Sequence, residues 1–179
     1  MHLEASAPSR LVPPTRRLDP ASLGDHVDRL YRAARGLCGS REDAEDLVQE
    51  TYVRVLQRPR WLRSEDDLRY LLRVLRNTHY SRLRAAGRRP RPDSLEDELD
   101  HVQDRSAPAP ESNLDAREVY ALIAALPDPF REAVVAVDLV GLSYREAATA
   151  LSVREATITT RLHRGRLRLA RALEQRDFG

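Results

Sequence analysis

The chain has 179 residues and a mass of 20.4 kDa, with 41% hydrophobic and 32% charged residues. This length suits one domain or two small ones and excludes a large multidomain enzyme. No segment approaches the ~20 apolar residues of a transmembrane helix, and the single cysteine, Cys38, excludes an internal disulfide. The five histidines lie far apart. We therefore expect no metal site, no cofactor, no membrane insertion and a cytoplasmic location.

All of the basic charge is arginine, with 30 Arg, no Lys and a net charge of +2. A GC-biased genome that replaces Lys codons with Arg codons would explain this composition without any function. The distribution is more informative, because residues 60–91 carry a local charge of +7, residues 93–115 carry −7, and six Arg follow Thr160. Two basic blocks on either side of an acidic spacer favour a protein that binds nucleic acid at two places.

Apolar residues at helical spacing and only seven glycines predict an all-α protein. Residues 1–20 are rich in Pro and Arg, lack the apolar segment of a secretory signal and are predicted to be a disordered leader. The first helices are predicted over residues 23–38, 40–59 and 64–87, the last two capped by serine. Five acids crowd the start of the second helix, where either the helix dipole or a binding function would explain them. The stripe of this helix that is expected to face the core is Ala44, Leu47, Val48, Thr51 and Val55.

Residues 91–112 are acidic, contain Pro and show no sustained periodicity. We therefore predict a flexible linker there, between two small helical domains at residues 21–90 and 113–176. The second domain is expected to open with helices over residues 113–126 and 130–140, separated by a Pro-Asp-Pro break. In the first of these, Val119, Leu122, Ile123 and Leu126 are expected to face inward.

A helix-turn-helix is predicted at about residues 144–163. A capping box made by Ser143 and Glu146 opens a short helix, and a tight connection leads to a long helix that reaches about Arg176. The long helix has one apolar stripe and an arginine-rich face opposite to it. Such a helix fits the major groove of DNA, although a packing helix with a solvated basic face has the same pattern.

Three aromatic residues, Trp61, Tyr70 and Tyr80, are interleaved with the arginines of residues 60–91. Aromatic rings in a basic groove stack unpaired bases, which favours binding of single-stranded DNA. Burial in the core of a small bundle is the other explanation for Trp61 and Tyr70. The sequence contains no phosphate-binding glycine loop, no nucleophile with a base and no paired carboxylates on a candidate cleft, so we expect no active site.

Two sets of motifs resemble the extracytoplasmic-function sigma factors of the sigma-70 family of bacterial RNA polymerase. Conserved region 2 of that family is similar to DAEDLVQETY at residues 43–52, the Arg-Asn pair at 76–77 and GRRP at 87–90. Region 4 is similar to the Leu-Pro pair at 126–127, FREA at 130–133, GLSYREAA at 141–148 and TITTRLHR at 157–164. The resemblance implies two helical domains and a specificity subunit of the polymerase without catalytic residues of its own.

The resemblance also implies the partners. The protein would bind core RNA polymerase at its clamp and flap regions, with the region 2 helix docked on the clamp. An anti-sigma factor would hold the protein inactive. The acidic linker would enter the cleft of the polymerase as a mimic of nucleic-acid charge, and the free protein would be a monomer. The residues implied for polymerase binding are Asp46, Leu47, Val48, Gln49, Glu50, Tyr52, Val53, Arg54 and Leu56.

Promoter DNA would be bound at two elements, one melted and one duplex. At the minus-ten element an extruded base of the non-template strand would enter a pocket, and at the minus-thirty-five element the long helix would read the major groove. The residues implied for the minus-ten element are Trp61, Arg73, Asn77, Tyr80, Ser81, Arg84 and Arg88. The residues implied for the minus-thirty-five element are Arg154, Glu155, Thr157, Thr159, Thr160, Arg161, His163 and Arg164.

The turn of the helix-turn-helix departs from the family pattern, which usually has Gly where this chain has Ser152. Ser152 and Glu155 match a capping box, so the long helix is expected to begin up to two residues early. Two other function classes stay open. A stand-alone transcriptional regulator would use the same helix-turn-helix, normally as a dimer on paired half-sites. A helical adaptor would use the same faces to bind protein only.

Overall fold

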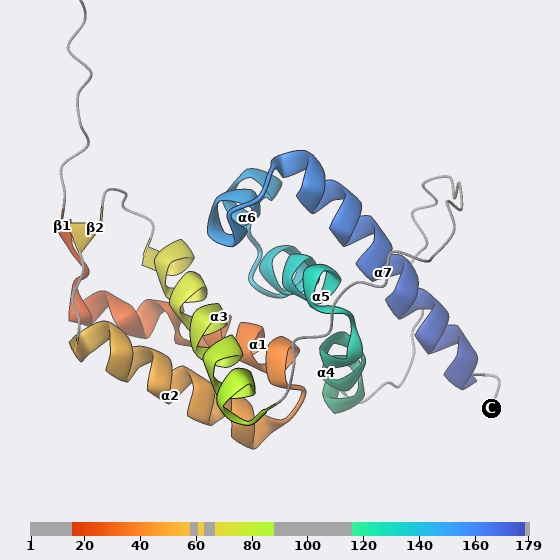
Figure 1. Ribbon diagram of the computed structural model, residues 1–179, viewed down its shortest axis with the longest axis horizontal. Helices are drawn as coiled ribbons and strands as arrows, with labels where there is room; N and C mark the ends of the chain where they lie inside the picture. The colour runs from red at the N-terminus through yellow and green to blue at the C-terminus, as the bar shows by residue number, and fades with distance from the viewer. Residues whose placement is uncertain (1–15, 58–60, 63–66, 88–115, 178–179) are drawn as a thin grey trace, which may run out of the picture.

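The structure, a computed structural model, describes residues 16–57, 61–62, 67–87 and 116–177 (Figure 1). Its secondary structure is helical apart from one antiparallel pair of two-residue strands, in which Arg17 lies opposite Trp61. This confirms the predicted all-α class. The elements of the first half are β1 (Arg16–Arg17), η1 (Pro20–His26), α1 (Val27–Cys38), α2 (Arg41–Gln57), β2 (Trp61–Leu62) and α3 (Asp67–Ala85). Those of the second half are α4 (Ala116–Ala125), α5 (Asp128–Val134), η2 (Val135–Leu139), α6 (Tyr144–Leu151) and α7 (Glu155–Asp177).

The first half is a bundle of α1, α2 and α3. All five residues of the stripe predicted for α2 are buried, and Ser40 caps this helix by accepting a 3.1 Å hydrogen bond from the Asp43 amide. Residues 23–26, predicted as the start of an α-helix, belong instead to the 3-10 helix η1, which opens at Pro20. Residues 16–20 of the expected leader therefore include a strand and the first residue of a helix, while residues 1–15 lie outside the described part.

The second half contains the predicted helix-turn-helix. Ser143 and Glu146 form the expected capping box, with both reciprocal hydrogen bonds present. The Pro-Asp-Pro break is shorter than predicted, because Asp128 and Pro129 belong to the first turn of α5, where proline needs no hydrogen-bond partner for its nitrogen. Residues 135–139 continue α5 as a wider π-turn. Val119, predicted to face inward, is 36% exposed, and Leu122 is half-buried.

Ser152 corrects the predicted start of the long helix. Its backbone is left-handed, with φ 58° and ψ 43°, and it ends α6 instead of capping α7. The Val153 amide donates back to the Ala148 carbonyl at 3.0 Å, which closes the last turn of α6. Helix α7 therefore begins at Glu155, and the expected early start is wrong. A left-handed residue with a side chain is strained, which is why glycine is common at such positions.

The two halves pack directly against each other (Figure 1). Helix α1 contacts α4 and η2, and α3 contacts α6, so buried residues from both halves form one hydrophobic cluster. Gly36 lies where α1 crosses η2. A methyl group at Gly36 would lie 2.5 Å from Leu139 Cδ1 and 2.8 Å from Val135 Cγ2, so a larger residue would force these side chains to shift. The halves are two helical domains, as predicted, and they share an interface.

Replacing Ser152 with Gly should stabilise the protein. The change relieves a left-handed backbone and should raise the free energy of unfolding by about 1 kcal/mol in urea denaturation. The matched control is Ser152→Ala, which removes the hydroxyl and keeps the strained Cβ. Equal stability of the two variants would show that the left-handed backbone costs nothing here.

Candidate functional site

The first candidate surface is the exposed face of α2. Asp46 and Gln49 are exposed, and two apolar side chains, Val53 and Leu56, are 49% and 52% exposed. Large apolar side chains beside acids on one helix face are typical of a protein-binding surface. We call Asp46, Gln49, Val53 and Leu56 the docking face.

Other residues that the resemblance implied for the same surface lie elsewhere. Leu47 is fully buried and Val48 is buried, so both hold α2 against the rest of the bundle. Tyr52 is half-buried and donates a 3.0 Å hydrogen bond to the Leu23 carbonyl. These three side chains support the docking face from beneath. None of them is part of the exposed face.

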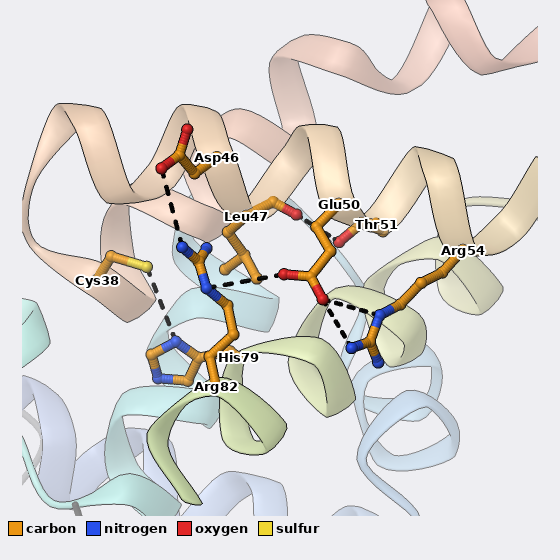
Figure 2. A network of polar contacts seen from close by, with 8 residues as sticks. All are labelled: Cys38, Asp46, Leu47, Glu50, Thr51, Arg54, His79 and Arg82. Atoms are coloured by element: carbon orange, nitrogen blue, oxygen red, sulfur yellow. Dashed lines mark hydrogen bonds and ion pairs between the residues drawn. The ribbon is translucent and has the colours of Figure 1, made fainter. Parts of the chain in front are cut away.

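Arginines lie close to two acids of α2, Asp46 in the docking face and Glu50 beside it (Figure 2). Glu50 accepts from Arg54 at 2.6 Å, one helical turn away, and its other oxygen lies 3.7 Å from Arg82 Nε on α3. A second nitrogen of Arg82 lies 3.9 Å from Asp46. Arg82 thus lies between the two acids and links α2 to α3. The resemblance gave this arginine no role, and nothing in the local sequence predicts the contact.

Beside this network, the half-buried Cys38 and the buried His79 form a polar pair (Figure 2). The Cys38 Sγ atom lies 3.7 Å from His79 Nδ1. Burial raises the pKa of the Cys38 thiol to about 11, and Asp43 adds to the shift. Burial, together with Arg131 and Arg82, lowers the pKa of His79 to about 4. At neutral pH the pair is therefore an uncharged thiol beside an uncharged imidazole.

The second candidate surface is the face of α3 that carries the predicted minus-ten residues. Arg73 and Asn77 are exposed and line a groove of about 470 Å³ between α2 and α3, together with Tyr70. Ser81 and Arg84 continue the face, with Arg84 donating to the Ser81 hydroxyl at 3.4 Å. The side chains of Trp61 and Arg88 lie outside the described part of the structure. The groove is basic, bordered by an aromatic ring and open to solvent.

Tyr80, on the same helix, is covered by the second half of the chain. Its hydroxyl is buried, and burial and the neighbouring Glu132 raise its pKa. Arg76 lies over the Tyr80 ring, 5.4 Å from its centre, and donates a 2.6 Å hydrogen bond to Glu132 on α5. Arg76 and Glu132 belong to two of the family motifs, and the resemblance implied no binding role for either. Their contact spans the interface between the two halves.

The third candidate surface is the start of α7. Six of the eight predicted residues have exposed side chains there: Arg154, Glu155, Thr159, Thr160, His163 and Arg164.

The other two predicted residues, Thr157 and Arg161, are half-buried. The hydroxyls of Thr159 and Thr160 donate to helix carbonyls one turn back, at 3.3 and 3.1 Å. This orders the side chains on the first turns of α7. Gly165 lets α7 lie close to α5, since a methyl group there would be 2.8 Å from Val134 Cγ2.

Comparison with known proteins gives a consistent result. The chain matches the family model for sigma-70 region 2 over residues 23–89 and that for sigma-70 region 4 over residues 116–169. It is 38% identical over 149 residues to the ECF RNA polymerase sigma factor SigE of Mycolicibacterium smegmatis, with 80% of this chain covered. The chain spans 57% of the length of that protein.

Two further proteins match over more of their length. The ECF RNA polymerase sigma factor EcfG of Rhodopseudomonas palustris is 32% identical over 159 residues, which cover 86% of this chain and 85% of EcfG. The sigma factor RpoE of Bartonella quintana, solved in complex with the anti-sigma factor NepR, superposes with a TM-score of 0.63 and 27% identity. That superposition covers 87% of this chain and 98% of the other.

The buried imidazole predicts a dependence of stability on pH. Below its ordinary pKa of 6.5, His79 takes up a proton in the unfolded chain but stays neutral in the fold down to about pH 4. The free energy of unfolding should therefore fall by about 2 kcal/mol between pH 7 and pH 5. Urea denaturation at both pH values measures this, and His79→Gln should reduce the fall. Identical pH dependence in the two proteins would contradict an uncharged, buried His79.

Proposed function

Because the chain belongs to the extracytoplasmic-function sigma factors of the sigma-70 family, we propose that it binds core RNA polymerase and directs initiation at a two-part promoter. One observation carries the proposal. Region 2 and region 4 occur in order in one chain, each with an exposed basic face of its own. As a specificity subunit it would supply contacts and leave the chemistry to the polymerase.

The docking face of α2 is our candidate for the polymerase-binding surface. Exposed Val53 and Leu56 would be buried against the partner, which is the main favourable term in association. Asp46 would add charge complementarity at the edge of this contact. The clamp and flap of the polymerase are the partner regions that the family resemblance implies.

The groove beside Arg73 and Asn77 is our candidate for the minus-ten site. Its volume of about 470 Å³ lies within the range of small-molecule pockets, so one extruded base could enter it. Tyr70 lines the groove, and the arginines along α3 would follow the phosphates of the melted strand. Holding a base outside the duplex would offset its unstacking, a few kcal/mol per base.

The start of α7 is our candidate for the minus-thirty-five site. Six of the eight residues predicted for this site are exposed, and the capped helix-turn-helix holds the helix in place, as major-groove readout requires. Farther along α7, arginines would reach phosphates. Each site alone would bind weakly, and the polymerase would make the two act together by holding both domains at a fixed separation.

An anti-sigma factor is the regulatory partner that we propose, since the B. quintana relative was solved in complex with one. A cytoplasmic location follows from the proposed partners.

Within the described residues, no helix combines the length and the apolar character needed to cross a bilayer.

The proposal is tested by transcription in vitro. Purified protein and core polymerase are incubated with pooled genomic fragments, and the 5′ ends of the transcripts are sequenced. Discrete start sites that need the protein and share two upstream elements are the expected result. The proposal fails if the protein neither binds core polymerase nor changes its start sites. A dimer that binds paired duplex half-sites without polymerase would point to a stand-alone regulator instead.

Charge reversal on α2 should disrupt polymerase binding. The double variant Asp46→Arg, Glu50→Arg places two positive charges beside Arg82 and should weaken core binding at least about tenfold in a pull-down titration or by fluorescence anisotropy. Glu42→Arg is the matched control, because Glu42 is exposed on the same helix and lies outside the docking face. Unchanged affinity of the double variant would refute the assigned surface.

Replacing Asn77 with Ala should damage promoter opening and leave polymerase binding intact. Asn77 is exposed in the groove, so its loss should spare the fold and lower open-complex formation by roughly tenfold, within the range for one lost base contact. The control is a template already melted at the minus-ten element. An equal loss on both templates would rule out a role in melting.

A further inference from the structure

The interface between the two domains covers part of the surface assigned to single-stranded DNA. Its apolar part lies between α1 and η2, where Gly36 meets Val135 and Leu139. Its polar part lies on α3, the helix that carries the minus-ten residues, where α6 packs. The interface between the domains therefore has an apolar part, between α1 and η2, and a polar part, between α3 and the second domain.

Two hydrogen bonds across the interface use arginines of α3. Arg76 donates to the Glu132 carboxylate at 2.6 Å, and Arg73 donates to the Thr149 carbonyl at 3.0 Å. Glu132 is only 7% exposed, so its charge depends on Arg76 for compensation. In each contact the second domain presents an oxygen acceptor to an arginine, as a DNA phosphate would.

A pocket between the domains is lined by residues of the minus-ten surface and of the minus-thirty-five surface. It has a volume of about 500 Å³, with Asn77, Tyr80 and Arg84 on one side and Glu132, Leu151 and Arg161 on the other. Residues predicted for both promoter elements therefore line one pocket. A DNA strand that followed α3 past Arg76 would collide with α5 and α6, while the exposed start of α7 stays accessible.

We infer that this packed arrangement is an autoinhibited form of the free protein, in which region 4 covers the part of the minus-ten face around Arg76 and Tyr80 and Glu132 occupies the position of a phosphate beside Arg76. The inference rests on the proposed function. Binding of a single strand along α3 past Arg76 requires the domains to separate, and both the Arg76–Glu132 ion pair and the Gly36 contact oppose separation. Duplex readout by α7 does not require it.

The distance between the domains tests the inference directly. The full chain carries Cys38→Ser, Glu42→Cys and Glu174→Cys, with spin labels on the two new cysteines, which replace exposed residues of α2 and α7. Double electron–electron resonance should give one narrow distance distribution. A broad distribution in this protein without polymerase would overturn the inference.

Two independent changes should open the interface. Glu132→Arg places like charges together, and Gly36→Leu puts a side chain into the space now filled by Leu139 and Val135. Each variant should broaden the distance distribution and shift it to longer distances. Adding Arg76→Glu to Glu132→Arg restores an ion pair and should narrow the distribution again. Asp138→Asn is the matched control, because it removes the 2.7 Å pair with Arg166 inside the second domain and should leave the distance unchanged. The inference is wrong if neither opening variant, folded by circular dichroism, changes the distribution.

The consequence for DNA is measured with fluorescein-labelled single-stranded DNA of random sequence. Glu132→Gln removes the charge that competes for Arg76 and should raise the affinity of the free chain by about fivefold or more, within the range of coupling between sites. Affinity unchanged in Glu132→Gln and in Gly36→Leu would mean that the interface inhibits nothing. The distance measurement needs no polymerase, so an open free chain that still directs transcription refutes only this inference. A closed chain that directs none refutes the proposed function.

Discussion

Helix α1 must be covered on two sides, and the rest of the architecture depends on that constraint. Its buried residues include Ala33, Ala34 and Gly36, which are small enough for other helices to approach closely. On one side α2 and α3 complete the first domain, and on the other α4 and η2 bring in the second. A short chain gains apolar burial in this way, because two small cores become one cluster.

Local rules predicted the local structure well. The capping box at Ser143, the cap at Ser40 and the buried stripe of α2 depend on residues within one or two turns, so the sequence is sufficient for them. Ser152 shows where such a rule fails. A serine three residues before a glutamate can cap a helix, but here the preceding turn of α6 closes over it first and forces a left-handed backbone.

The surfaces were less predictable than the helices. Helical spacing placed Leu47 and Val48 in the core, while the family resemblance implied that they bind polymerase, and the structure agrees with the spacing. Arg76 and Glu132 are 56 residues apart in the sequence and meet only because the domains pack together. Arg82 reaches the acids of α2 for the same kind of reason. The sequence shows that these side chains are charged. Their partners are determined by tertiary packing and could not be predicted from the sequence.

The pair formed by the half-buried Cys38 and the buried His79 has a consequence for the protein under oxidative stress. With its pKa near 11, the thiol is ionised in only about one molecule in ten thousand at pH 7, and peroxides react with the thiolate. The uncharged imidazole beside it cannot stabilise a thiolate as an imidazolium would. Cys38 should therefore react slowly with peroxides, and the packing around it should persist when exposed thiols in the same cell are converted to sulfenic acids.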